Sequence, residues 1–161
     1  MDKITKGMTE LSLENTELVL NTLETKGEFL SLTKGISMRP LFREGKDIVV
    51  IVKPTGELKK GDVPLYRRRN YDFLVLHRIL KVRDNDYIIR GDNTYSLEYV
   101  PKDFVVGVLK GFYRSGKYYD CNESRAYKVY IAFNRITYFL RKIWKTGIRP
   151  ILSKIKHTIF K

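Results

Sequence analysis

The stretch GISMRPLFREGKDIVV, residues 35–50, governs how the rest of the chain is interpreted. It leads from a small hydroxyl residue, Ser37, through a Met-Arg-Pro turn and Gly45 to the apolar run DIVV, which has the composition of a buried strand. A serine just before a proline-marked turn commonly caps a helix. A serine between a strand and a turn can instead expose its hydroxyl as a nucleophile, with its own N–H facing a developing oxyanion. Both interpretations apply to Ser37.

Short apolar runs separated by turn residues continue on both sides of this stretch. The runs with strand character are EFLSLTK (28–34), DIVVIVK (47–53), DVPLY (62–66), FLVLHRILKV (73–82), DYIIR (86–90), FVVGVLKGFYR (104–114) and KYYD (117–120). The pairs Asp84-Asn85 and Ser115-Gly116 lie between consecutive runs and predict hairpin turns. The pattern therefore predicts a mainly β (α+β) domain over residues 27–121.

Helical patterns flank this β region. Before it, TELSLENTELVLNTLETKG (9–27) places leucines near helical spacing and ends in glycine, which predicts a short helix within residues 1–26. After it, residues 122–161 carry aromatic and aliphatic side chains near helical spacing, with Arg and Lys between them, and Pro150 divides them into two amphipathic pieces. We expect an N-terminal helix, a β domain and a basic helical tail.

The positive charge is concentrated in that tail. The chain has 161 residues and a net charge of +13, but residues 124–161 hold 10 Lys and Arg and no acidic residue. The preceding 123 residues hold 21 basic and 18 acidic residues. Such a tail, with Tyr138 and Trp144 suited to the headgroup region, is able to lie on an anionic membrane. The alternative is that it packs on the β domain and exposes only its charged face.

Composition also restricts the compartment and the kind of site. A single cysteine, Cys121, excludes an internal disulfide framework and a zinc site built from cysteines. We find no cleavable signal sequence and no run of about 18 apolar residues able to span a bilayer. We therefore expect a cytoplasmic protein, either free or peripheral on the inner face of the membrane, and no cofactor.

Ser37, His77 and Asp92 are the candidate catalytic residues. His77 lies in an otherwise apolar run, where a histidine is usually structural, and the second histidine, His157, lies in the basic tail. Asp92 begins a glycine-anchored turn in RGDN. A serine nucleophile needs a base, and a histidine base needs an acceptor that fixes its tautomer. These residue types are common, so structural roles for Ser37 and His77 remain open on this pattern alone.

Five blocks in sequence order carry a resemblance to a known family. They are GISMRPLFREGKDIVV (35–50), LKKGDVPLY (58–66), VLHRILKV (75–82), YIIRGDNT (87–94) and VPKDFVVGVLKGF (100–112). They resemble the conserved boxes of type I signal peptidases and, more broadly, the signal peptidase and LexA-like serine peptidase superfamily. Together they cover roughly residues 34–113. The resemblance implies a signal peptidase-like β fold and peptide-bond hydrolysis by a serine nucleophile.

The resemblance also implies a role for each candidate residue. Ser37, in Gly-x-Ser-Met-x-Pro, matches the nucleophile. His77 stands where bacterial signal peptidases carry a general-base lysine, as in the archaeal and eukaryotic-type branch. Asp92, in Gly-Asp-Asn, matches the third member, and Glu98 stays an alternative to it as the residue that orients the histidine. Some members place an oxyanion-binding serine where this chain has Gly35, so backbone N–H groups would have to serve here.

The expected function is that of a serine endopeptidase acting on a peptide or leader segment. The substrate would lie extended beside an edge strand, for which SLTKGI (31–36) is the candidate. The family's usual transmembrane anchor before the serine box is not found. A LexA-type self-cleaving regulator is disfavoured, because 26 residues are too few for a helix-turn-helix domain.

A non-enzymatic basic module that binds nucleic acid or membranes is the other alternative. It would use the tail and the arginines of YRRRNYDF (66–73). The aromatic residues of the chain follow strand and helix spacing, which is more typical of a core than of a base-stacking platform, so a nucleic-acid partner is disfavoured.

Overall fold

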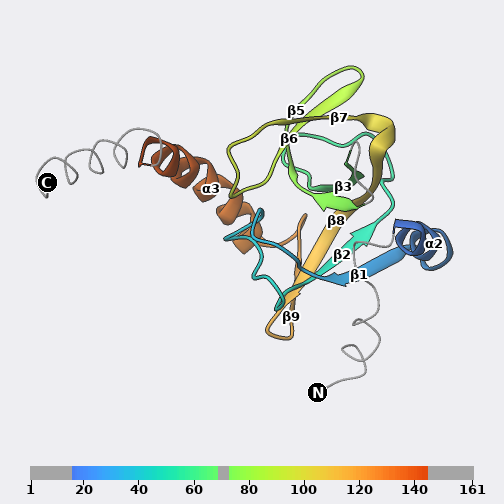
Figure 1. Cartoon of the computed structure of the whole chain (residues 1–161). Coiled ribbons are helices and arrows are strands. Elements are labelled where there is room, and N and C mark those ends of the chain that lie inside the picture. The colour runs from blue at the N-terminus through green and yellow to red at the C-terminus, as the bar shows by residue number, and fades with distance from the viewer. Residues whose placement is uncertain (1–15, 69–72, 145–161) are drawn as a thin grey trace, which may run out of the picture.

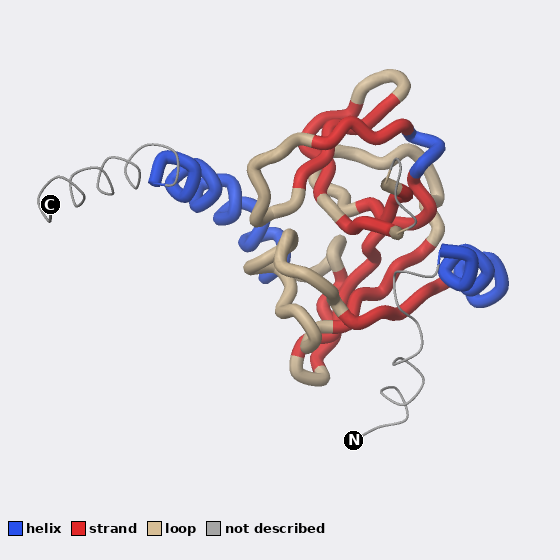
Figure 2. The backbone as a smooth tube through the Cα atoms, viewed as in Figure 1, coloured by secondary structure: helices blue, strands red, loops and turns tan. Residues whose placement is uncertain are grey.

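The computed structural model describes residues 16–68 and 73–144 (Figure 1). Several predicted features lie outside the described residues. They are the start of the N-terminal helix, part of the arginine-rich stretch 66–73, and the second amphipathic piece with Pro150 and His157. Two antiparallel sheets form the body of the described chain, and strands predominate over helices among its regular elements, as Figure 2 shows. The mainly β fold with a short N-terminal helix and a C-terminal helix is confirmed.

The larger sheet curves into an open half-barrel. Its strands are, in spatial order, β1 (Glu28–Leu32), β2 (Ile48–Val52), β8 (Val105–Arg114), β3 (Pro64–Arg67) and β4 (Leu74–Leu76), with β9 (Lys117–Asp120) also paired to β8. Strands β1 and β4 stand at the two ends of this strand order, because among the described residues each pairs with one neighbouring strand. The predicted hairpin turn at Ser115-Gly116 joins β8 to β9, and both residues have positive φ, as a tight hairpin turn requires.

The smaller sheet has three strands. They are β5 (Arg78–Val82), β6 (Asp86–Arg90) and β7 (Glu98–Pro101), and the predicted turn at Asp84-Asn85 joins the first two. A 3-10 helix, η1 (Lys102–Phe104), leads from β7 into β8. Strand β7 was not predicted, because Glu98–Pro101 has little β character and ends in proline.

The predicted strand over 73–82 is wrong in one respect: it is two strands in different sheets. Strand β4 pairs with β3, strand β5 pairs with β6, and His77 lies at the passage between them. The two halves enter separate hydrophobic clusters, since Leu74 belongs to the core of the larger sheet and Ile79 to that of the smaller one. Both halves are therefore apolar, and no turn residue marks the boundary.

Helix α2 (Thr16–Lys26) closes one end of the larger core. Val19 and Leu23 are fully buried against it, and the helix ends at Gly27, whose φ of 73° is the left-handed conformation common after a helix. The second long helix, α3 (Arg125–Ile143), begins at Ser124, whose hydroxyl accepts a hydrogen bond from the Tyr127 N–H. Neither of these described helices is long and apolar enough to cross a membrane.

Candidate active site

Ser37 lies in the loop between β1 and β2, and hydrogen bonds close that loop at its base. The Thr33 N–H donates to the Asp47 carbonyl at 3.0 Å, and the Gly45 N–H donates to the Thr33 carbonyl at 2.8 Å. The Asp47 carboxylate is completely buried and accepts hydrogen bonds from Arg43 and Arg114. The loop is thus anchored at both ends.

The Met-Arg-Pro segment forms a turn and not a helix. The Arg39 N–H donates to the Ile36 carbonyl at 3.1 Å, and the Phe42 N–H donates to the Met38 carbonyl at 3.2 Å. Met38 and Phe42 are buried in the larger core, so the segment after Ser37 is fixed by packing. The helix-cap interpretation of Ser37 is therefore wrong, because residues 38–44 contain no helix.

The Gly-Asp-Asn turn after β6 holds the other side of Ser37. The Asn93 N–H donates to the Ser37 carbonyl at 2.7 Å, and the Asn93 side-chain amide donates to the Ile36 carbonyl at 3.2 Å. Gly91 permits this approach: a Cβ there would stand 2.7 Å from the Ser37 carbonyl oxygen and 3.0 Å from His77 Nε2. One glycine therefore touches both the backbone of the serine and the ring of the histidine.

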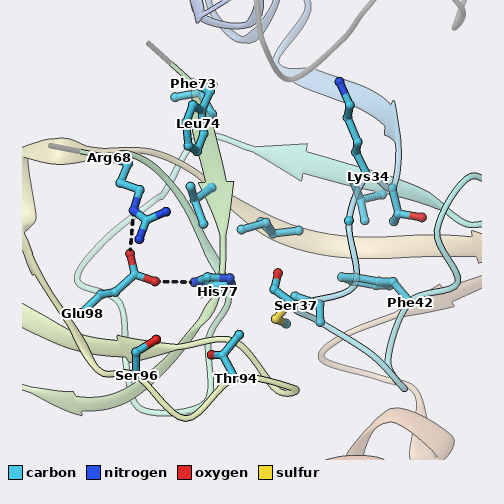
Figure 3. A pocket seen from close by; sticks show the side chains of 16 residues that line it. Lys34, Ser37, Phe42, Arg68, Phe73, Leu74, His77, Thr94, Ser96 and Glu98 are labelled. Carbon is cyan, nitrogen blue, oxygen red and sulfur yellow. Dashed lines mark hydrogen bonds and ion pairs between the residues drawn. The ribbon is translucent and has the colours of Figure 1, made fainter. Parts of the chain in front are cut away.

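His77 is buried and its Nδ1 has two partners. Glu98 Oε1 lies 2.9 Å from Nδ1, and the Tyr66 hydroxyl lies 3.2 Å from it. An ionised carboxylate can only accept a hydrogen bond, so Nδ1 carries the proton that it donates to Glu98. This tautomer leaves Nε2 with a free electron pair. Figure 3 shows that this second ring nitrogen faces Ser37.

Glu98 is held in its ionised form by its neighbours. The hydrogen bond from His77 lowers the pKa of the Glu98 carboxyl more than burial raises it, and the charge of Arg68 and a hydrogen bond from Tyr66 lower it further. The Arg68 Nε lies 3.4 Å from the second carboxylate oxygen, as the dashed lines in Figure 3 show. Burial raises the pKa of Tyr66, so its phenol stays protonated as a hydrogen-bond donor. Glu98 therefore remains an acceptor at neutral pH.

Asp92 occupies a different place from the one expected. Its two oxygens accept from Arg78 Nε at 2.9 Å and Arg78 Nη2 at 2.7 Å, and the Tyr130 hydroxyl donates to it at 2.9 Å. Neighbouring side chains of an extended segment point to opposite sides, so His77 and Arg78 face different carboxylates. Of the two acids that the sequence left open, the structure therefore places Glu98, and not Asp92, against the His77 ring.

Ser37 itself has unused hydrogen-bonding groups. Within the described residues, neither its hydroxyl nor its N–H has a hydrogen-bond partner, and no hydrogen bond joins the hydroxyl to His77. Catalytic hydrogen bonds are often long without substrate and shorten in the complex. Gly35, two residues earlier, has a φ of 77°, a backbone conformation that favours glycine over the serine some members of the resembled family carry.

A pocket of about 500 Å³ joins these groups. One wall is the loop that follows β1, including Ser37, and the other is the edge strand β4 with His77. Its apolar lining residues are Met38, Phe42, Val49, Phe73, Leu74, Val75 and Leu76, and its polar ones are Thr33, Lys34, Ser37, Arg68, His77, Thr94, Ser96 and Glu98, together with Gly35. The pocket therefore lies between the segment that follows β1 and strand β4, at the two ends of the strand order of the larger sheet.

Comparison with known proteins adds no assignment. No family model matches the chain. No curated protein has significant sequence similarity to it. Among the described residues there is also no group of three or more His, Cys, Asp or Glu side chains arranged to hold a metal ion.

Tyr66, which completes the surroundings of His77, was missed by the sequence analysis, because a tyrosine at the end of an apolar run carries no signal beyond packing.

Proposed function

We propose that the protein is a serine endopeptidase of the signal peptidase-like type, in which Ser37 is the nucleophile, His77 the general base and Glu98 the residue that orients His77. One observation carries the proposal. His77 Nδ1 donates a hydrogen bond to the partly buried Glu98 carboxylate at 2.9 Å, while the other ring nitrogen faces Ser37 in a pocket. If His77 had only a structural role, its second ring nitrogen would not be expected to face a serine whose hydroxyl has no other partner among the described residues. Asp92 acts as a positioning residue, because it holds the turn that bonds to the Ser37 backbone.

The chemistry follows the roles of these three side chains. The Ser37 oxygen attacks the peptide carbonyl carbon as its proton passes to His77 Nε2, and the resulting imidazolium is stabilised by the Glu98 carboxylate. His77 then returns the proton to the departing amine as the C–N bond breaks, which leaves an ester on Ser37. Water, activated by His77, hydrolyses this ester. The Ser37 N–H, which has no hydrogen-bond partner in the part of the chain that the structure describes, is available to stabilise the oxyanion in both steps.

The position of the pocket suggests how a substrate binds. An extended peptide in the pocket would run between the segment after β1 and strand β4, and it would be held by main-chain hydrogen bonds to these segments. The predicted substrate edge, residues 31–36, includes the end of β1 and one wall of the pocket. The side chain nearest to Ser37 would enter a space lined by Met38, Phe42 and Leu76, which favours an apolar residue at that position.

The experiment is covalent labelling of the full chain with a fluorophosphonate probe, read out by mass spectrometry of the digested protein. We expect one adduct, on Ser37, that is absent from Ser37→Ala and at least a hundredfold slower to form in His77→Ala. Ser96→Ala is the matched control, because Ser96 also lines the pocket but has no hydrogen bond to His77 or Glu98 within the described residues. Labelling at Ser37 that proceeds equally well in His77→Ala would contradict the proposed base.

The same variants separate an enzyme from a binding module. Incubation with a proteome-derived peptide library should give new peptide termini with the wild type and none with Ser37→Ala. Thermal unfolding should be nearly the same for both, because Ser37 makes no side-chain hydrogen bond in the described part of the chain. Cleavage that persists in Ser37→Ala would show that this serine is not the nucleophile.

A further inference from the structure

Helix α3 turns an apolar face to solvent. Six of its large hydrophobic side chains, and that of Trp144 directly after it, are each 41% to 68% exposed. They are Val129, Phe133, Ile136, Phe139, Leu140, Ile143 and Trp144. At 100° per residue they fall on one side of the helix, where they form a continuous stripe, here called the outer face. Scattered exposed hydrophobic residues are ordinary, but a stripe of this length marks an interaction site.

The opposite side of α3 is already occupied by the β domain. Tyr127 and Asn134 are buried there, and the Tyr130 hydroxyl donates to the Asp92 carboxylate at 2.9 Å. Near the other end, Arg141 donates to the Asp92 carbonyl at 3.3 Å, and the Tyr138 ring lies under the Arg90 guanidinium at 3.4 Å. A helix on a globular surface normally buries its apolar side and exposes its polar one. Helix α3 departs from this rule, because a long apolar stripe is exposed in addition to the residues Tyr127 and Ile131 that pack on the larger core.

These contacts fix which side is left exposed. Because polar and aromatic contacts run along the inner side of the helix, rotating α3 to bury the outer face would break the bonds of Tyr130 and Arg141 to Asp92. Figure 1 shows α3 at one side of the domain, projecting away from the two sheets. The outer face is thus directed away from the domain by the way the helix is attached.

The charges around the outer face identify its occupant. Lys128 and Lys142 are exposed on one border of the stripe, and residues 124–161 contain 10 basic residues and no acidic one. An apolar stripe with aromatic residues and a basic border is the pattern of a helix lying in the interface of an anionic membrane. A protein groove for an amphipathic helix would not require that every charge along this segment be positive.

We infer that the outer face of α3 docks the protein on an anionic lipid surface, with the helix parallel to the membrane and the β domain on its aqueous side. The inference is independent of the proposed catalysis. Docking of α3 would nevertheless affect which substrates reach the pocket. The turn that carries Asp92 and the pocket residue Thr94 lies against α3, so docking brings the pocket close to the bilayer. Polypeptides tethered to the same surface would then be the accessible substrates.

The test is co-sedimentation of the full chain with sucrose-loaded vesicles of phosphatidylcholine alone or with about one third phosphatidylglycerol. We expect binding to the anionic vesicles, much weaker binding to the neutral ones, and release by salt. Each basic residue near such a surface strengthens binding about fivefold. The double variant Lys128→Gln/Lys142→Gln should therefore weaken binding to anionic vesicles by about 25-fold.

Substitutions of the apolar stripe test the face itself. Phe133→Ser/Phe139→Ser removes two side chains that are 62% and 63% exposed and belong to neither of the hydrophobic core clusters. It should weaken vesicle binding at least tenfold while thermal unfolding is unchanged. The matched control is Tyr99→Ser, an aromatic side chain of equal exposure, 60%, on strand β7, and it should bind as the wild type does.

Three outcomes would overturn the inference. The first is no binding of the wild-type chain to anionic vesicles. The second is equal binding by the wild type and Phe133→Ser/Phe139→Ser, which would place the contact elsewhere. The third is a wild-type dimer, seen by sedimentation equilibrium, that becomes monomeric in this variant without any vesicle binding, which would make the outer face an interface between two copies. None of these readouts uses peptidase activity, so their failure is distinguishable from failure of the proposed function.

Discussion

Removal of the two carboxylates near the site, Asp92 and Glu98, should affect different properties of the protein. Asp92 is paired with a buried arginine, whereas Glu98 is paired with the candidate base. Asp92→Ala should therefore lower the free energy of unfolding. Glu98→Gln should lower the reactivity of Ser37 with little change in stability. This contrast tests the assignment of Glu98, in place of Asp92, as the residue that orients His77.

The magnitude for Asp92 follows from the burial of its partner. The side chains of Arg78 and Asp92 are 6% and 3% exposed, and removing one partner of such a buried pair costs about 3–5 kcal/mol, because an uncompensated charge remains. Arg78 keeps its hydrogen bonds to the Gly61 carbonyl at 2.8 Å and the Tyr127 hydroxyl at 3.0 Å. We therefore expect the lower end, about 3 kcal/mol, by urea denaturation. The exposed Arg83–Asp86 pair provides the control, since Asp86→Ala should cost far less.

The magnitude for Glu98 is kinetic. A glutamine at this position still accepts a hydrogen bond from Nδ1, but it carries no charge to stabilise the imidazolium that forms as Ser37 reacts. The rate of Ser37 labelling should fall by about 10²- to 10⁴-fold. Because Arg68 is partly exposed, the loss of its ion pair with Glu98 should change the free energy of unfolding by about 1 kcal/mol or less.

Two results would refute this reasoning. Labelling of Glu98→Gln within twofold of the wild-type rate would show that the carboxylate at 2.9 Å does not assist His77. An unfolding free energy of Asp92→Ala equal to that of Asp86→Ala would show that the Arg78–Asp92 pair is not buried as the structure has it. Replacing both partners, in Arg78→Met/Asp92→Leu, should restore much of the stability lost in Asp92→Ala, since no buried charge is left unpaired.

Two further predictions concern the backbone and the loop that present Ser37. Gly91→Ala should slow Ser37 labelling at least tenfold, because the new methyl group would stand 2.7 Å from the Ser37 carbonyl oxygen, while Gly56→Ala, with nothing within 4 Å, should label normally. Burial alone would raise the pKa of Asp47, but hydrogen bonds from Arg114 and Arg43 together outweigh burial and lower it. The contribution of Asp47 to the free energy of unfolding is therefore complete above its unfolded pKa and is lost as pH falls through the lower folded pKa. Urea denaturation from pH 6 down to about pH 3 should thus give a shallower decline for Asp47→Asn than for the wild type, and parallel curves would contradict the prediction.

Local patterns in the sequence predicted most strands and both hairpin turns. Ser115-Gly116 and Asp84-Asn85 were found because turn residues interrupt apolar runs at those points. The passage of the chain from one sheet to the other at His77 was not predicted, because the residues on both sides of it are apolar, although Leu74 packs into the larger core and Ile79 into the smaller one. A period-2 pattern reports burial of a strand but not which of two cores the strand enters.

The site was predicted in its residue types but not in its pairing. The sequence singled out Ser37 and His77, and the structure brings them to one pocket. It could not decide between Asp92 and Glu98, because that choice depends on Arg78, which neutralises Asp92 in three dimensions. An arginine directly after a histidine looks like an ordinary strand residue. Only the pairing of β5 with β6 and of β6 with β7 determines which carboxylate each side chain meets.

Asp92 also links the two proposals physically. Helix α3 holds its carboxylate through Tyr130 and its carbonyl through Arg141. The residue after it, Asn93, donates to the Ser37 carbonyl at 2.7 Å, and the Asp92 N–H lies 3.5 Å from the sulfur of Met38. The helix whose outer face is exposed is therefore separated from the candidate nucleophile by a single tight turn. If α3 docks on a membrane as proposed, any shift of the helix would act first on the residues that fix the Ser37 backbone, and a small change in the position of a nucleophile is enough to change the rate of its attack.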